Sequence, residues 1–195
     1  MNFQGTQVLP QGVQRVWDAL LDPAVLQQSI AGCESFERVS DTEYTSKVKV
    51  GIGPVSARFA STMTLLDLSP PHGCTLRFAG QGGVAGFGKG EARVTLVAQG
   101  ESETRLDWSA DAQVGGKLAQ LGSRLIEGSV RKMSEDFFQR FAEQLAQGQA
   151  GAQAGAVAQT EEALVAPAGG GVARVAAIAA ACGALAMLAL LWITR

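Results

Sequence analysis

The sequence predicts an α+β fold, in which a curved antiparallel sheet grips one long C-terminal helix. Two observations predict this domain: segments between residues 44 and 112 alternate apolar and polar side chains, and residues 116–146 repeat apolar side chains at helical spacing. A third observation extends the architecture, because Val175–Ile193 contains no charged residue. We therefore expect a linker and a single C-terminal transmembrane helix after the folded domain.

Composition limits the classes of function. The chain has 195 residues, of which 47% are hydrophobic and 17% charged, and its formal net charge is −2. A slightly acidic chain lacks the basic excess that neutralises phosphates, so no nucleic-acid partner is predicted. The low charge, combined with high apolar content, also argues against a wholly disordered chain.

The domain is expected to begin with a strand and two short helices. Residues 1–9 have a strand-like pattern, and the apolar positions that follow Pro10 have helical spacing as far as Asp22-Pro23. A second short helix is predicted to end at Gly32.

Five segments with period two predict the antiparallel strands that follow. Their inward series are expected to be Tyr44, Ser46, Val48, Val50 and Ile52; Val55, Ala57, Phe59, Ser61, Met63 and Leu65; Cys74, Leu76 and Phe78; Ala92, Val94, Leu96 and Ala98; and Leu106, Trp108, Ala110 and Ala112.

One long helix over residues 116–146 is expected to cover this sheet. Its predicted buried face carries Leu118, Leu121, Leu125, Met133, Phe137, Phe141 and Leu145. A curved sheet around a helix commonly leaves a hollow between the two, and residues 1–146 are therefore predicted to form a ligand-binding domain.

The last fifty residues differ in composition. Between Ala146 and Gly171, 19 of 26 residues are Ala, Gly or Gln, which predicts a flexible linker at residues 147–171. About 20 apolar residues cross the hydrocarbon core of a bilayer, so residues 172–195 are predicted to be a membrane anchor, with side chains that include Val175, Leu185, Leu190 and Trp192. A buried helix of the core is the alternative, but nothing else in the chain would cover a helix that is apolar all round.

The predicted location is the cytoplasmic (inner) membrane. Met1–Thr6 has no basic residue and leads directly into a strand pattern, so no signal peptide is expected. The domain is then expected to face the cytoplasm from a single-pass C-terminal anchor.

Two glycine-rich matches to nucleotide-binding motifs are weak. Gly80–Ala85 fits G-x-G-x-x-A and Gly83–Lys89 fits G-x-x-x-x-G-K, but a strand pattern follows where a phosphate site needs a helix N-terminus. We expect instead a wide connection or bulge, or a mobile lip over the cavity that carries Phe87.

No catalytic or metal-binding residue is predicted. His72 is the one histidine, it lies in a Pro-Pro-His-Gly turn, and the three cysteines lack CxxC spacing. Asp107 and Asp111 are expected to be solvated, and the inward series contain almost no acids or bases. Because catalysts need such groups in their pockets, the composition favours a binding module over an enzyme.

The apolar interior has two interpretations. Its large side chains form an ordinary core, or some of them line a pocket for a long hydrophobic molecule, next to the small residues of the covering helix. The predicted lining is Tyr44, Phe59, Met63, Phe78, Phe87, Trp108, Leu118, Leu121, Gly122 and Leu125. Tyr44 and Trp108 combine an aromatic face with a hydrogen-bond donor, so they are the candidates for binding a polar head group.

Several motifs occur together in this chain: Leu20–Pro23, Ile30–Glu34, Lys49–Pro54 with Phe59, Gly80–Gly83 with Gly90, and Val114–Ile126 ahead of Phe137-Phe138. Together they resemble the family of the carbon monoxide dehydrogenase G subunit, within the START-like (SRPBCC) helix-grip superfamily. The resemblance covers about residues 1–146. The chain departs from the family at Ala31, where proline is usual, and at Val55–Arg58, where Gly-Lys often precedes the phenylalanine.

This resemblance implies recruitment of a molybdenum hydroxylase of the carbon monoxide dehydrogenase type to the membrane. It also implies a cavity able to hold a respiratory quinone, which would link that enzyme to the respiratory chain without a cofactor of the domain's own. A pure membrane anchor or assembly factor that binds no ligand remains as an alternative, and so does a small-molecule cyclase or hydrolase of the same superfamily.

Overall fold

A computed structural model describes the backbone of residues 1–157 and the side chains of residues 1–147. The predicted anchor and most of the predicted linker lie outside the described residues. The elements in order are β1 (Asn2–Leu9), α1 (Val13–Leu21), α2 (Pro23–Ser29), β2 (Cys33–Arg38), β3 (Glu43–Ile52), β4 (Val55–Ser69), β5 (Gly73–Gln81), η1 (Gly83–Ala85), β6 (Phe87–Ala98), β7 (Thr104–Gly115), η2 (Ala119–Leu121) and α3 (Ser123–Val157).

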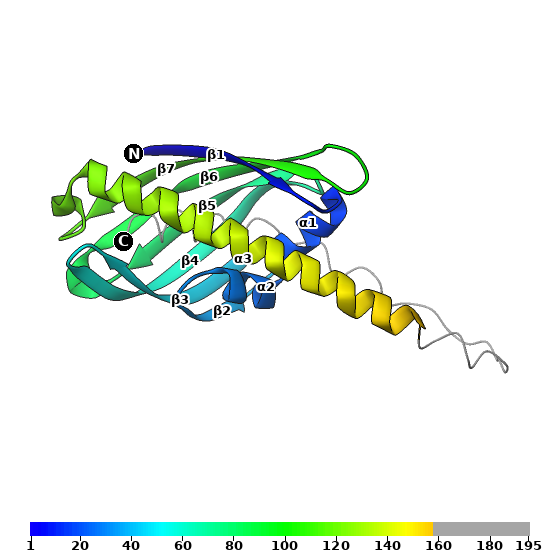
Figure 1. Ribbon diagram of the computed structural model, residues 1–195. Coiled ribbons are helices and arrows are strands. Elements are labelled where there is room, and N and C mark those ends of the chain that lie inside the picture. Colours follow the sequence, from blue (N-terminus) through cyan, green and yellow to red (C-terminus); the bar gives the residue numbers. More distant parts are fainter. Residues whose placement is uncertain (158–195) are drawn as a thin grey trace.

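One seven-stranded antiparallel sheet forms the body of the domain. Its strand order is β1-β7-β6-β5-β4-β3-β2, so the first strand forms one edge of the sheet, next to the last strand, and β2 forms the other edge. The sheet curves, and α3 crosses one face along its length while α1 and α2 cover the end at which β1 leaves the sheet (Figure 1). This is the predicted α+β architecture.

The strands confirm the predicted alternation. In β3 every second residue is buried, from Tyr44 to Ile52, and in β4 the buried series runs from Phe59 to Leu65. These residues belong to the same buried core as the inner face of α3, which crosses this face of the sheet (Figure 1). The opposite, convex face of the sheet carries ion pairs such as Arg77–Glu91, in which Nη2 of the arginine lies 2.7 Å from Oε1 of the glutamate.

Strand β2 is an element that the sequence pattern did not reveal. Within Cys33–Arg38 only Phe36 is fully buried, and a register shift lies between Cys33 and Ser35. An edge strand with one buried side chain has too little alternation for the pattern to detect.

The long helix begins later than predicted. Residues 116–122 form turns and η2, because Gly116 and Gly122 both have φ +81°, which an α-helix cannot contain. Helix α3 therefore starts at Ser123, and Leu118, Leu121 and Gly122 precede it.

Leu125 lies off the buried face of α3 and is 43% exposed. The predicted face followed steps of four residues, whereas a helix repeats every 3.6 residues. Over the twelve residues from Leu125 to Phe137, the direction in which the side chain leaves the helix axis therefore turns by about 120°. The buried face consists of Ile126, Val130, Met133, Ser134, Phe137, Phe138, Phe141 and Leu145.

Helix α3 also continues beyond the predicted end at residue 146, as far as Val157. Alanine and glutamine are good helix formers, so the first residues of the predicted linker extend the helix. Within the part of the chain that the structure describes, no helix is long and apolar enough to cross a membrane.

Candidate functional site

Three of the predicted lining residues form one row across the concave face. Tyr44 on β3 is paired with Met63 on β4, and Met63 is paired with Phe78 on β5. The row continues with Gly90 on β6 and Ala112 on β7, which add little bulk. All three large side chains are buried. The fold therefore brings these predicted residues together.

The next row toward the β3–β4 turn is made almost entirely of small residues. Ser46, Ser61, Gly80 and Gly88 are successive partners on β3, β4, β5 and β6, and the row ends at Val114. Beyond it, Val48 is paired with Phe59, whose ring a Cβ at Gly82 would overlap. We call the row of small residues the low row. The concave site consists of this low row and the rows on its two sides, which contain Tyr44, Met63 and Phe78 on one side and Val48 and Phe59 on the other.

Two hydroxyl groups in the concave site have no hydrogen-bond partner among the described residues: the Tyr44 Oη and the Ser61 Oγ. Tyr44 is 1% exposed and Ser61 is 6% exposed, so neither hydroxyl is open to bulk solvent. Buried polar groups are nearly always hydrogen-bonded, because an unpaired one costs about 1–3 kcal/mol. The two donors are therefore suited to a ligand's acceptor atoms.

Apolar and cationic groups surround the Tyr44 ring. The Phe36 ring centroid lies 5.7 Å away and the Arg38 guanidinium carbon lies 5.9 Å from the Tyr44 centroid. Burial raises the pKa of the Tyr44 phenol, and the neighbouring Arg38 guanidinium opposes this rise only in part. The phenol is therefore protonated at neutral pH and is available as a donor.

The remaining predicted residues lie outside these rows. Leu118 is buried, and its backbone N–H donates to the Ala85 carbonyl at 3.1 Å, so it ties the start of the helix region to η1. Leu121 is half-buried, Gly122 is exposed, and Phe87 is 38% exposed. These positions and Leu125 form the end of the domain beside the concave site.

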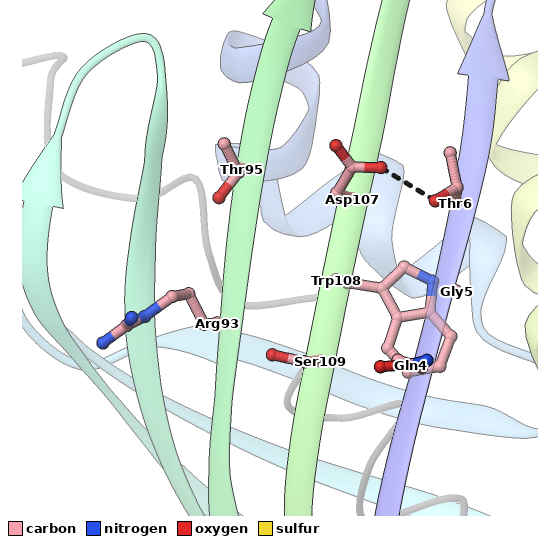
Figure 2. A pocket seen from close by; sticks show the side chains of 8 residues that line it. All are labelled: Gln4, Gly5, Thr6, Arg93, Thr95, Asp107, Trp108 and Ser109. Atoms are coloured by element: carbon pink, nitrogen blue, oxygen red, sulfur yellow. Dashed lines mark hydrogen bonds between the residues drawn. The ribbon is translucent and has the colours of Figure 1, made fainter.

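Trp108 lies far from Tyr44, although both were predicted to bind a head group. Three strands, β4, β5 and β6, separate their strands, which corresponds to about 19 Å along a flat sheet. The indole lies against Gly5 of β1, where a Cβ would come within 2.7 Å of the ring (Figure 2). The two residues therefore do not form one head-group site.

The hollow beside Trp108 opens on the convex face and has a volume of about 480 Å³. Its other side chains are polar, among them Arg93, Asp107 and Thr6, whose hydroxyl donates to the Asp107 carboxylate at 2.8 Å (Figure 2). A groove of about 330 Å³ between β1 and α3 reaches Trp108 from another side, and Ser134 lies in it. Neither hollow has the apolar lining of the concave site.

Acid–base groups are scarce in the described core. The buried polar side chains there are Gln11, Ser29, Ser46, Ser61, Thr104 and Ser134, in addition to Tyr44. The described residues include no group of three metal-ligating side chains. Burial raises the pKa of the half-buried Cys33 thiol to about 11, which makes it a poor nucleophile at neutral pH.

Sequence reasoning missed the low row that separates Tyr44 from Phe59. The signal was present, because Ser46 and Ser61 occupied inward positions in two predicted strands. Their pairing with Gly80 and Gly88 depends on the register between strands, which the pattern of one strand does not contain.

A family model matches the chain over residues 5–146; it describes the G subunit of carbon monoxide dehydrogenase (CoxG). No curated protein matches the sequence.

Solved structures share the fold. A conserved protein from Geobacillus kaustophilus is 31% identical, with a TM-score of 0.71; the match covers 75% of this chain and 96% of that one. A START superfamily protein from Mycobacterium smegmatis (13% identity, TM-score 0.59, 75% and 97% covered) and the Zhui aromatase/cyclase from a Streptomyces species (11%, 0.58, 75% and 94%) are also similar. The match covers nearly all of the Geobacillus chain, so that protein folds with little beyond this domain.

Proposed function

Because the chain belongs to the CoxG family, the G subunits of carbon monoxide dehydrogenase, we propose that it is an accessory protein of a molybdenum hydroxylase of that type. In this proposal the domain binds a respiratory quinone in the concave site. It carries the quinone between the membrane and the hydroxylase. The quinone then transfers electrons from the hydroxylase to the respiratory chain. The domain needs no redox cofactor of its own for this role.

The pair of unpartnered hydroxyls at Tyr44 and Ser61 is the observation that supports a quinone most directly. A purely hydrocarbon ligand would leave both donors unsatisfied, whereas a quinone has two carbonyl oxygens that accept hydrogen bonds. The apolar rows on each side suit its ring and isoprenoid tail, whose burial contributes about 25 cal/mol per Å². The low row of Ser46, Gly80 and Gly88 offers the least side-chain bulk for a flat ring.

Membrane tethering by residues 172–195 completes the proposal. The uncharged run Val175–Ile193 has the length and composition of a membrane span. A carrier of a lipid-soluble molecule benefits from a position beside the bilayer that supplies it. The resulting location is the cytoplasmic face of the inner membrane.

A binding role agrees better with the described core than catalysis does. One structural neighbour is an aromatase/cyclase, but at 11% identity it supports the fold alone. The described buried polar side chains are hydroxyls and amides, without a carboxylate or imidazole that could transfer protons at neutral pH.

A second candidate function is a membrane anchor that recruits the hydroxylase and binds no ligand. The observation in its favour is the burial of Tyr44, Met63 and Phe78 against the rest of the core, as expected for ordinary packing. In that case the concave site is structural, and the enzyme binds through the surface of the domain.

Mass spectrometry of organic extracts distinguishes the two functions. The full chain and residues 1–157 are purified from a quinone-producing host, and the quinone is quantified against protein. We expect a stoichiometric quinone in both, and less of it in Tyr44→Phe and Ser61→Ala. Protein without quinone that still captures the hydroxylase would support the anchor. Deletion of residues 172–195 is expected to release the domain from membranes in a high-salt wash that leaves the full chain attached.

A further inference from the structure

One end of the sheet combines exposed apolar side chains with an excess of positive charge. Residues 51–56, 81–89 and 113–125 make up this end: they form the β3–β4 turn, the β5–β6 connection, and the segment from the end of β7 to the start of α3. We call it the basic tip.

Large apolar side chains are exposed at the basic tip. Val84 is 85% exposed, and Phe87 and Leu125 are 38% and 43% exposed. Two close approaches connect the three segments: the Leu118 N–H donates to the Ala85 carbonyl, and a Cβ at Gly53 would come within 3.2 Å of the Leu125 side chain. The apolar side chains therefore come from connected parts of one surface, and such surfaces mark interaction sites.

The charges of the basic tip all have the same sign. Its segments contain Lys89, Lys117 and Arg124, which are all exposed, and no Asp or Glu. None of the three forms an ion pair that the structure records among the described residues. Exposed apolar groups surrounded by lysine and arginine match a bilayer interface that contains anionic lipids.

The other end of the sheet has the opposite charge. Residues 39–43, 66–73 and 98–104 contain Asp41, Glu43, Asp67, Glu101 and Glu103, and no Lys or Arg. Arg38 and Arg105 adjoin these segments and reduce the negative excess without cancelling it. An anionic surface would thus attract the basic tip and repel the acidic end, which selects one orientation of the domain.

We propose that the basic tip is a second membrane-binding element, which docks reversibly on anionic bilayers independently of the C-terminal segment. Docking places Val84, Phe87 and Leu125 in the interface and brings Phe59, which touches Gly82 of the tip, next to the lipid. The inference goes beyond the proposed function, for which the C-terminal anchor suffices.

Vesicle sedimentation of residues 1–157 tests docking in the absence of the anchor. The vesicles are pure phosphatidylcholine, or phosphatidylcholine with 30% phosphatidylglycerol. We expect binding to the anionic vesicles that weakens as salt is raised, and a loss of about fivefold in affinity for Lys117→Gln or Arg124→Gln.

Val84→Asp and Val39→Asp form a matched pair of variants. Both replace an exposed valine with aspartate, but Val39 is 61% exposed at the acidic end. We expect Val84→Asp to lower vesicle binding at least tenfold and Val39→Asp to leave it unchanged, with equal thermal stability of the two variants. Equal binding by the two, or no binding of the wild-type domain to either kind of vesicle, overturns the proposal.

The quinone content of the same preparations separates this inference from the proposed function. Val84→Asp is expected to retain quinone after purification, because Val84 lies outside the concave site. Domain that binds anionic vesicles but contains no quinone would refute the carrier function and support docking. The converse result, quinone without vesicle binding, would refute docking alone.

Discussion

Tyr44 and Ser61 lie on adjacent strands of the concave face, offset by two residues in the register, and each buries a hydroxyl that has no hydrogen-bond partner among the described residues. Residues in this diagonal relation are close enough to contact one small molecule. An interior can retain such groups when their partner is a ligand. We therefore expect the two hydroxyl groups to lower the stability of the domain and to favour binding of the ligand.

Replacement of Tyr44 by phenylalanine should therefore separate stability from binding. We expect Tyr44→Phe to leave the free energy of unfolding unchanged or raise it by about 1–3 kcal/mol, because it removes an unsatisfied donor. Quinone retention is expected to fall. Urea denaturation and extract mass spectrometry measure the two effects.

Thr104 provides the control, since its buried hydroxyl donates to the Gln11 carbonyl at 2.7 Å. Thr104→Val should lower the free energy of unfolding by about 1 kcal/mol without affecting the ligand. If Tyr44→Phe destabilised the protein as Thr104→Val does, the phenol would have a structural partner.

The same phenol predicts a dependence of stability on pH. Its pKa is raised above 10.0 in the folded protein, so ionisation of the phenol favours the unfolded state, and the stability of the wild type falls as the pH rises from 10 toward the folded-state pKa. Tyr44→Phe lacks this group, so its free energy of unfolding should exceed that of the wild type by an amount that grows above pH 10, by at most about 1.4 kcal/mol per pH unit. Urea titrations from pH 8 to 11 measure it; a constant difference would contradict the shifted pKa.

The β5–β6 connection provides a comparison of two glycines. Gly83 (φ +60°) has open space around a would-be Cβ, whereas at Gly86 (φ +119°) a Cβ would overlap the Gly115 carbonyl. We expect Gly83→Ala to cost about 1 kcal/mol of stability and Gly86→Ala to cost more, because only the second also displaces backbone. Thermal unfolding measures both costs. Equal costs would mean that the backbone of β7 at Gly115 shifts to admit the new Cβ without a loss of stability.

Added bulk should affect the ligand only within the concave site. Phe59→Trp enlarges a buried side chain beside the low row, so we expect loss of quinone with the fold retained. Gly122→Phe is expected to keep the ligand, because Gly122 is exposed and its surroundings are open, but to lower stability, because its φ of +81° disfavours any side chain. Extracts of both variants test this contrast. Equal quinone in Phe59→Trp and wild type would exclude Phe59 from the lining.

The sequence predicted the sheet well because period two is a property of single strands. The buried series of β3, from Tyr44 to Ile52, was visible without knowledge of any neighbouring strand. The start of α3 was not predictable from apolar spacing, since the left-handed conformations of Gly116 and Gly122 interrupt a pattern that otherwise continues.

The candidate site was predictable only in part, for a similar reason. Tyr44, Met63 and Phe78 were each recognised as inward, but their alignment in one row depends on pairing between strands. Trp108 was inward by the same criterion, yet strand order puts it near the opposite edge of the sheet.

The length of α3 limits how the two membrane-binding elements could act together. Its 35 residues make it about 52 Å long, and it starts at the basic tip, so the chain leaves the helix far from the surface on which the tip would dock. Residues 158–171, which lie between α3 and the predicted anchor, could span at most about 50 Å, slightly less than the length of the helix. Docking and anchoring in one bilayer would therefore compete, and the number of residues between α3 and the anchor would set how often the domain reaches down to the lipid.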